Sequence, residues 1–212
     1  MLLPRLPLAY TDEKSRENKR KIFMNVEIVN EICESVKNAC NSPQNKFGYG
    51  IWTNHIEKVV EYGIKLSVIF GADEEIVVIS ALLHDLAGIL DYTLHDEHHI
   101  YGAELAEKIL SNYNFPIEKI EKVKLCILNH RGSRKNDLKS NEEKCIASAD
   151  AMAHITEIHS LFYYVYNEAQ LNIEEGREWI VSKIERSWNK LDVQARELIE
   201  EEYNAIKVLF GR

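Results

Sequence analysis

Five of the eight histidines in this 212-residue chain fall between residues 84 and 130. They are His84, His95, His98, His99 and His130. His84 is followed directly by Asp85 at the end of an apolar segment, so a helix there would carry an imidazole and a carboxylate into the core. Because an unpaired buried charge is very costly, the doublet needs a partner. A metal ion and a hydrogen-bonded core acid both stay open as partners for the doublet taken alone.

Asp150 is a second carboxylate in apolar surroundings. It stands in the run Ser148-Ala149-Asp150-Ala151-Met152-Ala153. A carboxylate among small and apolar residues of a helix needs a buried partner, which is either a metal ion or a lysine or arginine. With His55 and the His84-Asp85 doublet it offers a mixed set of nitrogen and oxygen donors. Such a set suits manganese, iron, cobalt, nickel or zinc better than a metal selected by thiolates.

The order of these residues resembles the HD superfamily of metal-dependent phosphohydrolases. The pattern of that superfamily is a His, a His-Asp doublet after Ala-Leu-Leu or a similar run, and a later Asp. Here the doublet stands in Ser80-Ala81-Leu82-Leu83-His84-Asp85, and the resemblance covers about residues 50–165. Two further segments resemble the subgroup that binds two metals: His98-His99-Ile100-Tyr101-Gly102-Ala103 and Asn129-His130-Arg131-Gly132.

The resemblance implies a set of metal ligands. A first ion would be held by His55, His84, Asp85 and Asp150. Asp85 would bridge to a second ion held by His98 and His130, which makes two divalent ions per chain, iron or manganese first and cobalt, nickel or zinc as alternatives. The family motif selects His98 over His99, whereas helical periodicity leaves the two open because each continues an apolar face. For His130 the alternative role is a cap at a helix C-terminus.

The chain departs from the family pattern at Gly88, where many members carry a lysine expected to contact a substrate phosphate. Positive charge must then come from elsewhere, and the basic loop after His130 is the nearest source. We expect Arg131 to contact phosphate, because a guanidinium matches phosphate oxygens in two-point geometry; a solvated loop residue is its alternative role. Arg134 and Lys135 are expected to be solvated.

Other polar and aromatic residues are interpreted as structural. Asp91, His95 and Asp96 are expected in a polar surface turn rather than in a lid over the site. His154 lies four residues after Asp150 and faces the same side, but a surface or core histidine is favoured over one that orients a ligand. The aromatic run Leu161–Tyr166 is expected to pack against outer helices rather than to stack on a base.

Hydrolysis of a phosphate ester or anhydride by attack of a metal-bound hydroxide is the activity that the resemblance implies, with Asp85 and Arg131 in the catalytic set. The formal charge of −8 disfavours a nucleic acid polymer as partner, so the expected substrate is a nucleotide or another small phosphorylated metabolite. A di-iron oxygenase and a non-catalytic nucleotide-binding domain are the alternatives.

Helices must position these residues, because no alternating strand pattern occurs in the sequence. They are predicted over Ser15–Cys40, from Asn54 to Phe70, from Asp73 to near Gly88, over Glu97–Asn112, from Pro116 to His130, from Glu142 to Tyr166, and over Ile173–Trp188 and Asp192–Leu209. The expected fold is a single all-α domain, an HD-type helical bundle with extra N- and C-terminal helices. Residues 1–50 would pack on a metal-binding core at 51–166, and 167–212 would belong to the same domain.

Composition limits the cellular location that we expect for the protein and the state of its cysteines. No apolar run approaches the roughly 20 residues that cross a bilayer, and Met1–Tyr10 does not resemble a signal peptide, so we expect a cytoplasmic protein. The four cysteines form no Cys-x-x-Cys pair and are expected as buried thiols. The apolar stripe of the first helix leaves a homodimer open.

Overall fold

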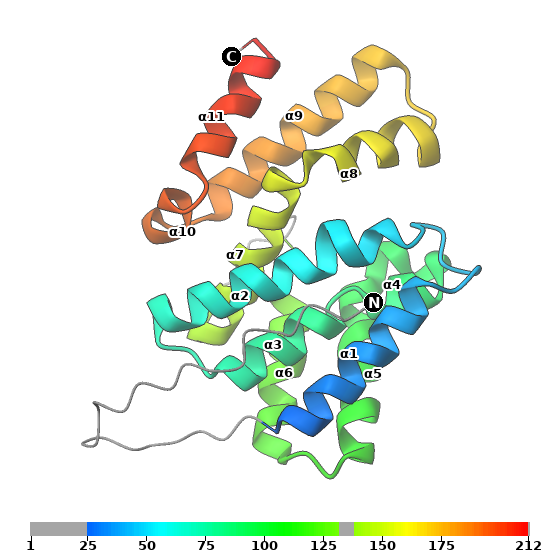
Figure 1. The fold of residues 1–212 in the computed structure, drawn as a ribbon, viewed down its shortest axis with the longest axis vertical. Coiled ribbons are helices and arrows are strands. Elements are labelled where there is room, and N and C mark those ends of the chain that lie inside the picture. Colours follow the sequence, from blue (N-terminus) through cyan, green and yellow to red (C-terminus); the bar gives the residue numbers. More distant parts are fainter. Residues whose placement is uncertain (1–24, 132–137, 212) are drawn as a thin grey trace, which may run out of the picture.

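Helices make up all the regular structure in residues 25–131 and 138–211, the part of the chain that the computed structural model describes (Figure 1). The all-α class expected from the sequence is confirmed. Residues 15–24 of the first predicted helix, Arg134 and Lys135 lie outside this part. In chain order the elements are α1 (Val26–Cys40), η1 (Trp52–Ile56, a π-helix), α2 (Glu57–Phe70), α3 (Glu74–Leu83), α4 (Leu86–Leu90), η2 (Tyr92–Glu97, a 3-10 helix), α5 (His98–Asn112), α6 (Ile117–Asn129), α7 (Asn141–Thr156), α8 (Ile158–Tyr163), η3 (Tyr164–Glu168, a π-helix), α9 (Ile173–Lys190), α10 (Val193–Glu197) and α11 (Glu200–Leu209).

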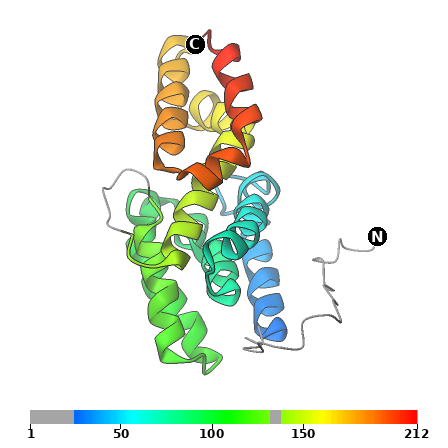
Figure 2. The ribbon, with the colours of Figure 1, turned by 90° about the vertical axis from the view of Figure 1, so that its left-hand side faces the viewer.

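The helices form two groups joined by α7. In Figures 1 and 2, α1 to α6 occupy the lower half of the molecule and α8 to α11 the upper half, and α7 runs from one half into the other. α7 packs against α2 and α6 in the lower group and against α9 and α11 in the upper group. We call α8 to α11 the C-terminal helices.

Two helices lie at the centre of the core. α3 is buried at every residue from Glu75 to Leu83, and α7 is buried at every residue from Cys145 to Ala153. A helix that is apolar on all sides must be surrounded by other elements, which is the position that α3 and α7 take. Asp150 is therefore presented inside the molecule, as its apolar surroundings predict.

Some helix ends follow the predicted signals and others do not. Asp73 caps α3 by accepting two backbone amide hydrogen bonds, and Gly71 ends α2 with a left-handed φ of 66°, both as predicted. The predicted helix start at Asn54 is wrong, because the backbone is already helical at Gly50 and Asn54 lies inside η1. Short π-helical segments often occur at functional sites, and this one carries His55.

Three helices are interrupted where continuous helix was predicted. α3 was expected to run to near Gly88 but ends at Leu83, and Asp85 leaves regular helical geometry with φ −105° and ψ 0°. Similar interruptions divide the helices predicted from Glu142 to Tyr166 and over Asp192–Leu209, at Glu157 and Ile199. The first interruption matters most, because it separates His84 and Asp85 from the regular helix and lets both side chains face the same point.

The cysteines are free thiols in the interior. Cys40, Cys126 and Cys145 are buried, as predicted, whereas Cys33 is partly exposed. Burial raises the pKa of Cys40 and Cys145 to about 12, so these thiols stay protonated and unreactive at neutral pH. Within the described residues, no helix has the length and apolar character needed to cross a membrane.

Candidate metal centre

Six predicted residues converge on one point from separate elements. They are His55 in η1, His84 and Asp85 between α3 and α4, His98 at the start of α5, His130 after α6, and Asp150 in α7. All are buried except Asp85, whose side chain is 24% exposed. The two carboxylates and four imidazoles are thus collected in the interior, with a single partly open face.

The Asp85 carboxylate stands between two pairs of histidines. Its Oδ2 atom lies 3.2 Å from His55 Nε2 and 3.3 Å from His84 Nε2. Its Oδ1 atom lies 3.1 Å from His98 Nε2 and 3.8 Å from His130 Nε2. Each oxygen of one carboxylate therefore faces one pair of imidazoles.

Within each pair, two imidazole nitrogens face each other. The distance between Nε2 atoms is 3.1 Å for His55 and His84 and 3.2 Å for His98 and His130. Two neutral imidazoles that both present lone pairs would repel at this distance. A proton or a metal cation between them removes the repulsion, so each pair is a place for positive charge.

Three of these histidines are oriented by the helix that they end. His84, His98 and His130 are the C-cap residues of α3, η2 and α6. The Nδ1 atom of each lies 2.5–2.8 Å from the carbonyl oxygen three residues earlier in the chain. Because a carbonyl can only accept, Nδ1 must carry a proton, which leaves Nε2 as the ring nitrogen that faces the centre. This is the arrangement by which proteins orient metal-ligating histidines.

Asp150 sits at the other side of His55 and has two further partners. Its Oδ1 atom lies 3.6 Å from His55 Nε2 and 3.1 Å from His154 Nε2. Its Oδ2 atom lies 3.3 Å from Lys190 Nζ, which also donates to the backbone carbonyl of His130. The lysine partner left open by the sequence is therefore present, alongside the histidine cluster.

The electrostatics of the cluster favour ionised carboxylates. Burial alone would raise the pKa of Asp85, but the facing His84 and His98 outweigh it and hold that pKa well below its usual range. Burial is likewise outweighed at Asp150 by His154 and Lys190, so its pKa also falls well below the usual range. Two ionised carboxylates, one buried and one partly exposed, thus require compensating positive charge at the cluster.

This donor set fits a divalent cation. His55, His84 and Asp85 form one group whose ligand atoms lie within 4.8 Å of one another, and Asp85, His98 and His130 form a second. Two donors bound at about 2.1 Å to one first-row metal ion stand about 3.0–3.4 Å apart, which most of the Nε2 and Oδ separations here match. A third group consists of His55, Asp150 and His154. His99 is absent from all three groups, so the structure brings His98 to Asp85 in its place.

A pocket of about 280 Å³ opens onto the cluster, between the lower helices and the C-terminal helices. Its lining includes the aromatic residues Phe47, Tyr164 and Trp179. The rings of Phe47 and His95 lie 5.4 Å apart, and those of Tyr164 and Trp179 also lie 5.4 Å apart. The lining also includes four cationic residues, Arg131, Lys183, Arg186 and Lys190. Aromatic rings together with cationic groups suit a ligand that is planar at one end and anionic at the other.

Sequence reasoning assigned several pocket residues to other roles. His95 was expected in a surface turn but is half-buried, lines the pocket and stacks near His98 with ring centres 5.7 Å apart. His154 is a partner of Asp150 and stacks on His55 at 4.8 Å. Arg131 does line the pocket, although its guanidinium donates to the carbonyl of Asp96.

The contribution of α9 was not predicted. Lys183, Arg186 and Lys190 come from a helix that sequence reasoning assigned only to packing. The one available signal was their spacing of three and four residues, which places them on one helical face with Trp179. Elsewhere in this region the aromatic run does pack on outer helices as predicted, since the rings of Phe162 and Phe210 lie 6.2 Å apart.

Fold and site define an all-helical protein with a buried histidine–aspartate centre that is compatible with divalent metal binding. The family model for the HD domain matches residues 52–155, the segment that carries all six converging residues. Residues 52–155 of this chain therefore form an HD domain.

Solved structures share this fold. YpgQ of Bacillus subtilis is 18% identical, with a TM-score of 0.66 and coverage of 89% of this chain and 94% of that one. YpgQ in complex with ADP is 19% identical, with a TM-score of 0.61 and coverage of 83% and 90%. A predicted HD superfamily hydrolase from an uncultured Thermotogales bacterium is 23% identical, with a TM-score of 0.50 and coverage of 75% and 84%.

A curated relative is also similar over part of its length. It is an uncharacterized protein of Clostridium beijerinckii, 37% identical over 71 residues. The match spans 34% of this chain and 45% of that relative.

Proposed function

We propose that this chain is a metal-dependent phosphohydrolase that cleaves a phosphoester or phosphoanhydride bond of a nucleotide or a similar small phosphorylated metabolite. The observation that carries the proposal is the Asp85 carboxylate, with one oxygen toward the His55–His84 pair and the other toward the His98–His130 pair. A carboxylate shared in this way suits two cations that act on one phosphoryl group.

The proposed centre holds two divalent ions per chain, iron or manganese first, with cobalt, nickel or zinc as alternatives. The ligands of the first ion are His55, His84, Asp85 and Asp150. The second ion takes His98 and His130 and shares Asp85. Bound here, the ions would polarise a phosphoryl oxygen and lower the pKa of a water molecule toward neutrality.

Protein side chains supply binding and orientation. Lys190 and His154 hold the two oxygens of Asp150 from opposite sides, which fixes the carboxylate without help from the substrate. Arg131 lies at the pocket as a partner for substrate phosphate. The aromatic rings in the pocket lining support a substrate with a planar ring, and the ADP complex of the similarly folded YpgQ supports a nucleotide as that substrate.

The pocket also supports the proposed domain organisation. We propose that the core at residues 51–166 and the residues from 167 onward form one domain, because α9 contributes a wall of the same pocket and packs on α7. Of the predicted N-terminal segment 1–50, residues 25–50 would belong to it as well, since α1 packs against α3 and α4, and residues 1–24 lie outside the described part of the chain.

The test is metal content per chain after anaerobic purification, followed on the same sample by phosphate release from a panel of nucleotides and phosphoesters with manganese, iron and magnesium. We expect about two metal ions per chain and release from at least one nucleotide. His84→Ala should lose metal and release together, whereas Arg131→Ala should mainly raise KM. Two iron ions with oxygen consumption and no release would contradict the proposal in favour of an oxygenase, and tight nucleotide binding without turnover would leave a binding domain.

A further inference from the structure

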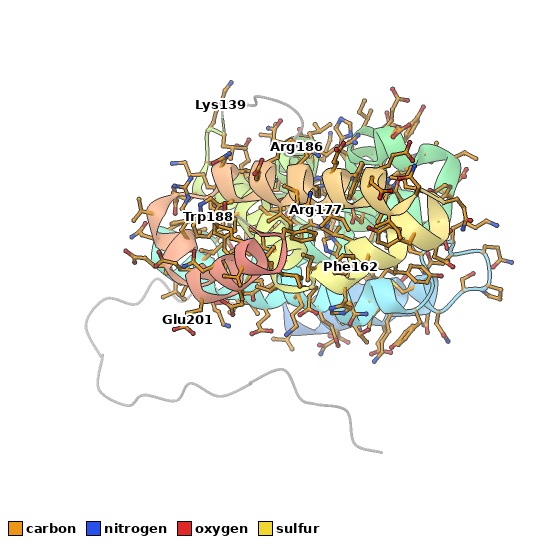
Figure 3. The ribbon with its side chains drawn as sticks, turned by 90° about the horizontal axis from the view of Figure 1, so that it is seen from above. Lys139, Phe162, Arg177, Arg186, Trp188 and Glu201 are labelled. Carbon is orange, nitrogen blue, oxygen red and sulfur yellow. The ribbon has the colours of Figure 1, made fainter. Side chains whose placement is uncertain are left out.

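The wall that α9 contributes to the pocket is a continuous stripe. Trp179, Lys183, Arg186 and Lys190 are separated by four, three and four residues, which places them on one face of the helix, and all four line the pocket. Figure 3 shows Arg186 on the side of α9 opposite to Arg177, in agreement with a spacing of nine residues. The stripe therefore brings positive charge to the site in a protein whose formal charge is −8.

Three of the four cationic side chains at the pocket are already engaged. Lys190 contacts Asp150 and donates to the carbonyl of His130. Arg131 donates to the carbonyl of Asp96, and Arg186 donates to the hydroxyl of Ser182. These three cationic side chains therefore already have hydrogen-bond partners within the protein.

Lys183 differs from the other three. It makes no hydrogen bond and no ion pair within 4 Å to any described residue, although it is partly buried and lines the pocket. The carboxylate that it influences most is Asp150, which already has Lys190 and His154 as direct partners. An ammonium group withdrawn from water without a partner is unfavourable, so this position favours an anionic ligand.

Gly88 lines the same pocket, and a Cβ atom at this residue would stand 3.4 Å from the Cβ of His98. Glycine therefore adds no side chain to the pocket next to the metal centre.

We propose that Lys183 is a phosphate-binding residue, whose ammonium group contacts phosphate oxygens of a substrate held at the metal centre. The inference deepens the proposed function and rests on it for the identity of the bound anion. The expected ligands are phosphate groups at the end of a nucleotide, with Arg186 one turn further along α9 as a second contact for a longer phosphate chain.

The experiment compares Lys183→Met with the wild type, both loaded with metal, by isothermal titration with inorganic pyrophosphate, ADP and adenosine. Loss of one charge-assisted hydrogen bond should weaken pyrophosphate and ADP by about tenfold and leave adenosine unchanged. Lys183→Arg keeps the charge and should recover most of the affinity. Lys207→Met, in the exposed part of α11, is the matched control for the change in net charge and should bind as the wild type does.

A second measurement uses the wild type alone, in case the methionine variant loses metal or fold. Pyrophosphate should protect Lys183 from reductive methylation, as read by mass spectrometry, whereas adenosine should not. Equal pyrophosphate affinity in Lys183→Met, or no protection of Lys183, would overturn the inference.

These outcomes separate the inference from the proposed function. Phosphate release by the wild type with an unaffected Lys183 variant refutes the role of Lys183 alone. Pyrophosphate binding that depends on Lys183, without release from any ester, refutes the hydrolase and supports the binding role. A wild-type protein that binds neither pyrophosphate nor ADP refutes both.

Discussion

Replacing Asp85 by asparagine should empty both halves of the centre, because a single carboxylate serves them both. Its two oxygens lie 3.1 Å from His98 Nε2 and 3.2 Å from His55 Nε2, whereas Asp150, the other carboxylate of the proposed ligand set, lies near His55 and serves the first ion only. Asparagine keeps the shape of the side chain and removes its charge. Replacing His98 by alanine, in contrast, removes a donor from one half only.

The size of the effect follows from charge and distance. A cation between Asp85 and either histidine pair lies closer than about 4 Å to the carboxylate, where two unit charges interact by about 4 kcal/mol at an effective dielectric constant of about 20. That energy corresponds to about a thousandfold in dissociation constant, and a divalent ion loses more. Asp85→Asn should therefore weaken both ions at least a thousandfold.

The assay is elemental analysis and chelator competition on protein that has been stripped and reloaded with manganese. We expect about two ions per chain for the wild type, fewer than about 0.2 for Asp85→Asn, and about one for His98→Ala. Asp96→Asn is the matched control, because Asp96 is exposed on η2 near the site. Two ions retained by Asp85→Asn at wild-type affinity would refute the shared-carboxylate reasoning, and the loss of both ions in His98→Ala would refute the division into halves.

Three further predictions concern stability and pH. Gly63→Ala should lower the free energy of unfolding by about 1–2 kcal/mol in urea titration, because its Cβ would stand 2.9 Å from buried Val77; a more stable variant would contradict this close packing. Lys190→Met leaves Asp150 without its 3.3 Å partner and should cost about 3 kcal/mol in the same assay, whereas an unchanged midpoint would mean that His154 suffices. Burial would lower the pKa of His84, but the adjoining carboxylate raises it to about 9. Metal must displace that proton, so chelator competition should show affinity rising about tenfold per pH unit from pH 7 and levelling off near pH 9, and a flat profile would contradict it.

The sequence predicts helices better than it predicts where they stop. The stripe Ile120, Val123 and Ile127 is buried in α6 as its spacing predicts, because a periodic apolar face needs only local information. Between Leu83 and Gly88, however, no proline or glycine marks the interruption of α3. The helix ends there because the side chains of His84 and Asp85 are held by groups from other elements, which a local pattern does not contain.

The order of the histidines and aspartates along the chain predicted the candidate ligands. The lysines that surround the site could not be predicted in this way. The sequence identified Asp150 because an aspartate among alanines on a helix is buried and therefore needs a buried partner. Lys183 and Lys190 lack such a signal, since a lysine on an amphipathic helix is ordinarily a solvated residue. Which face of α9 meets the pocket is decided by its packing on α7, a helix that ends at Thr156, well before α9 begins at Ile173.

The position of the histidines at helix ends explains how order along the chain becomes geometry. His84 ends α3 and His130 ends α6, and each closes the last turn of its own helix through Nδ1 and the carbonyl three residues before. The same bond satisfies a carbonyl that lacks a helical partner and turns Nε2 toward the centre. The negative ends of these two helices also favour a cation there, by roughly 0.3–1 kcal/mol each. A histidine one position earlier would be rotated by about 100° around the helix axis and would miss Asp85. The position of the helix end therefore determines whether the histidine can act as a ligand.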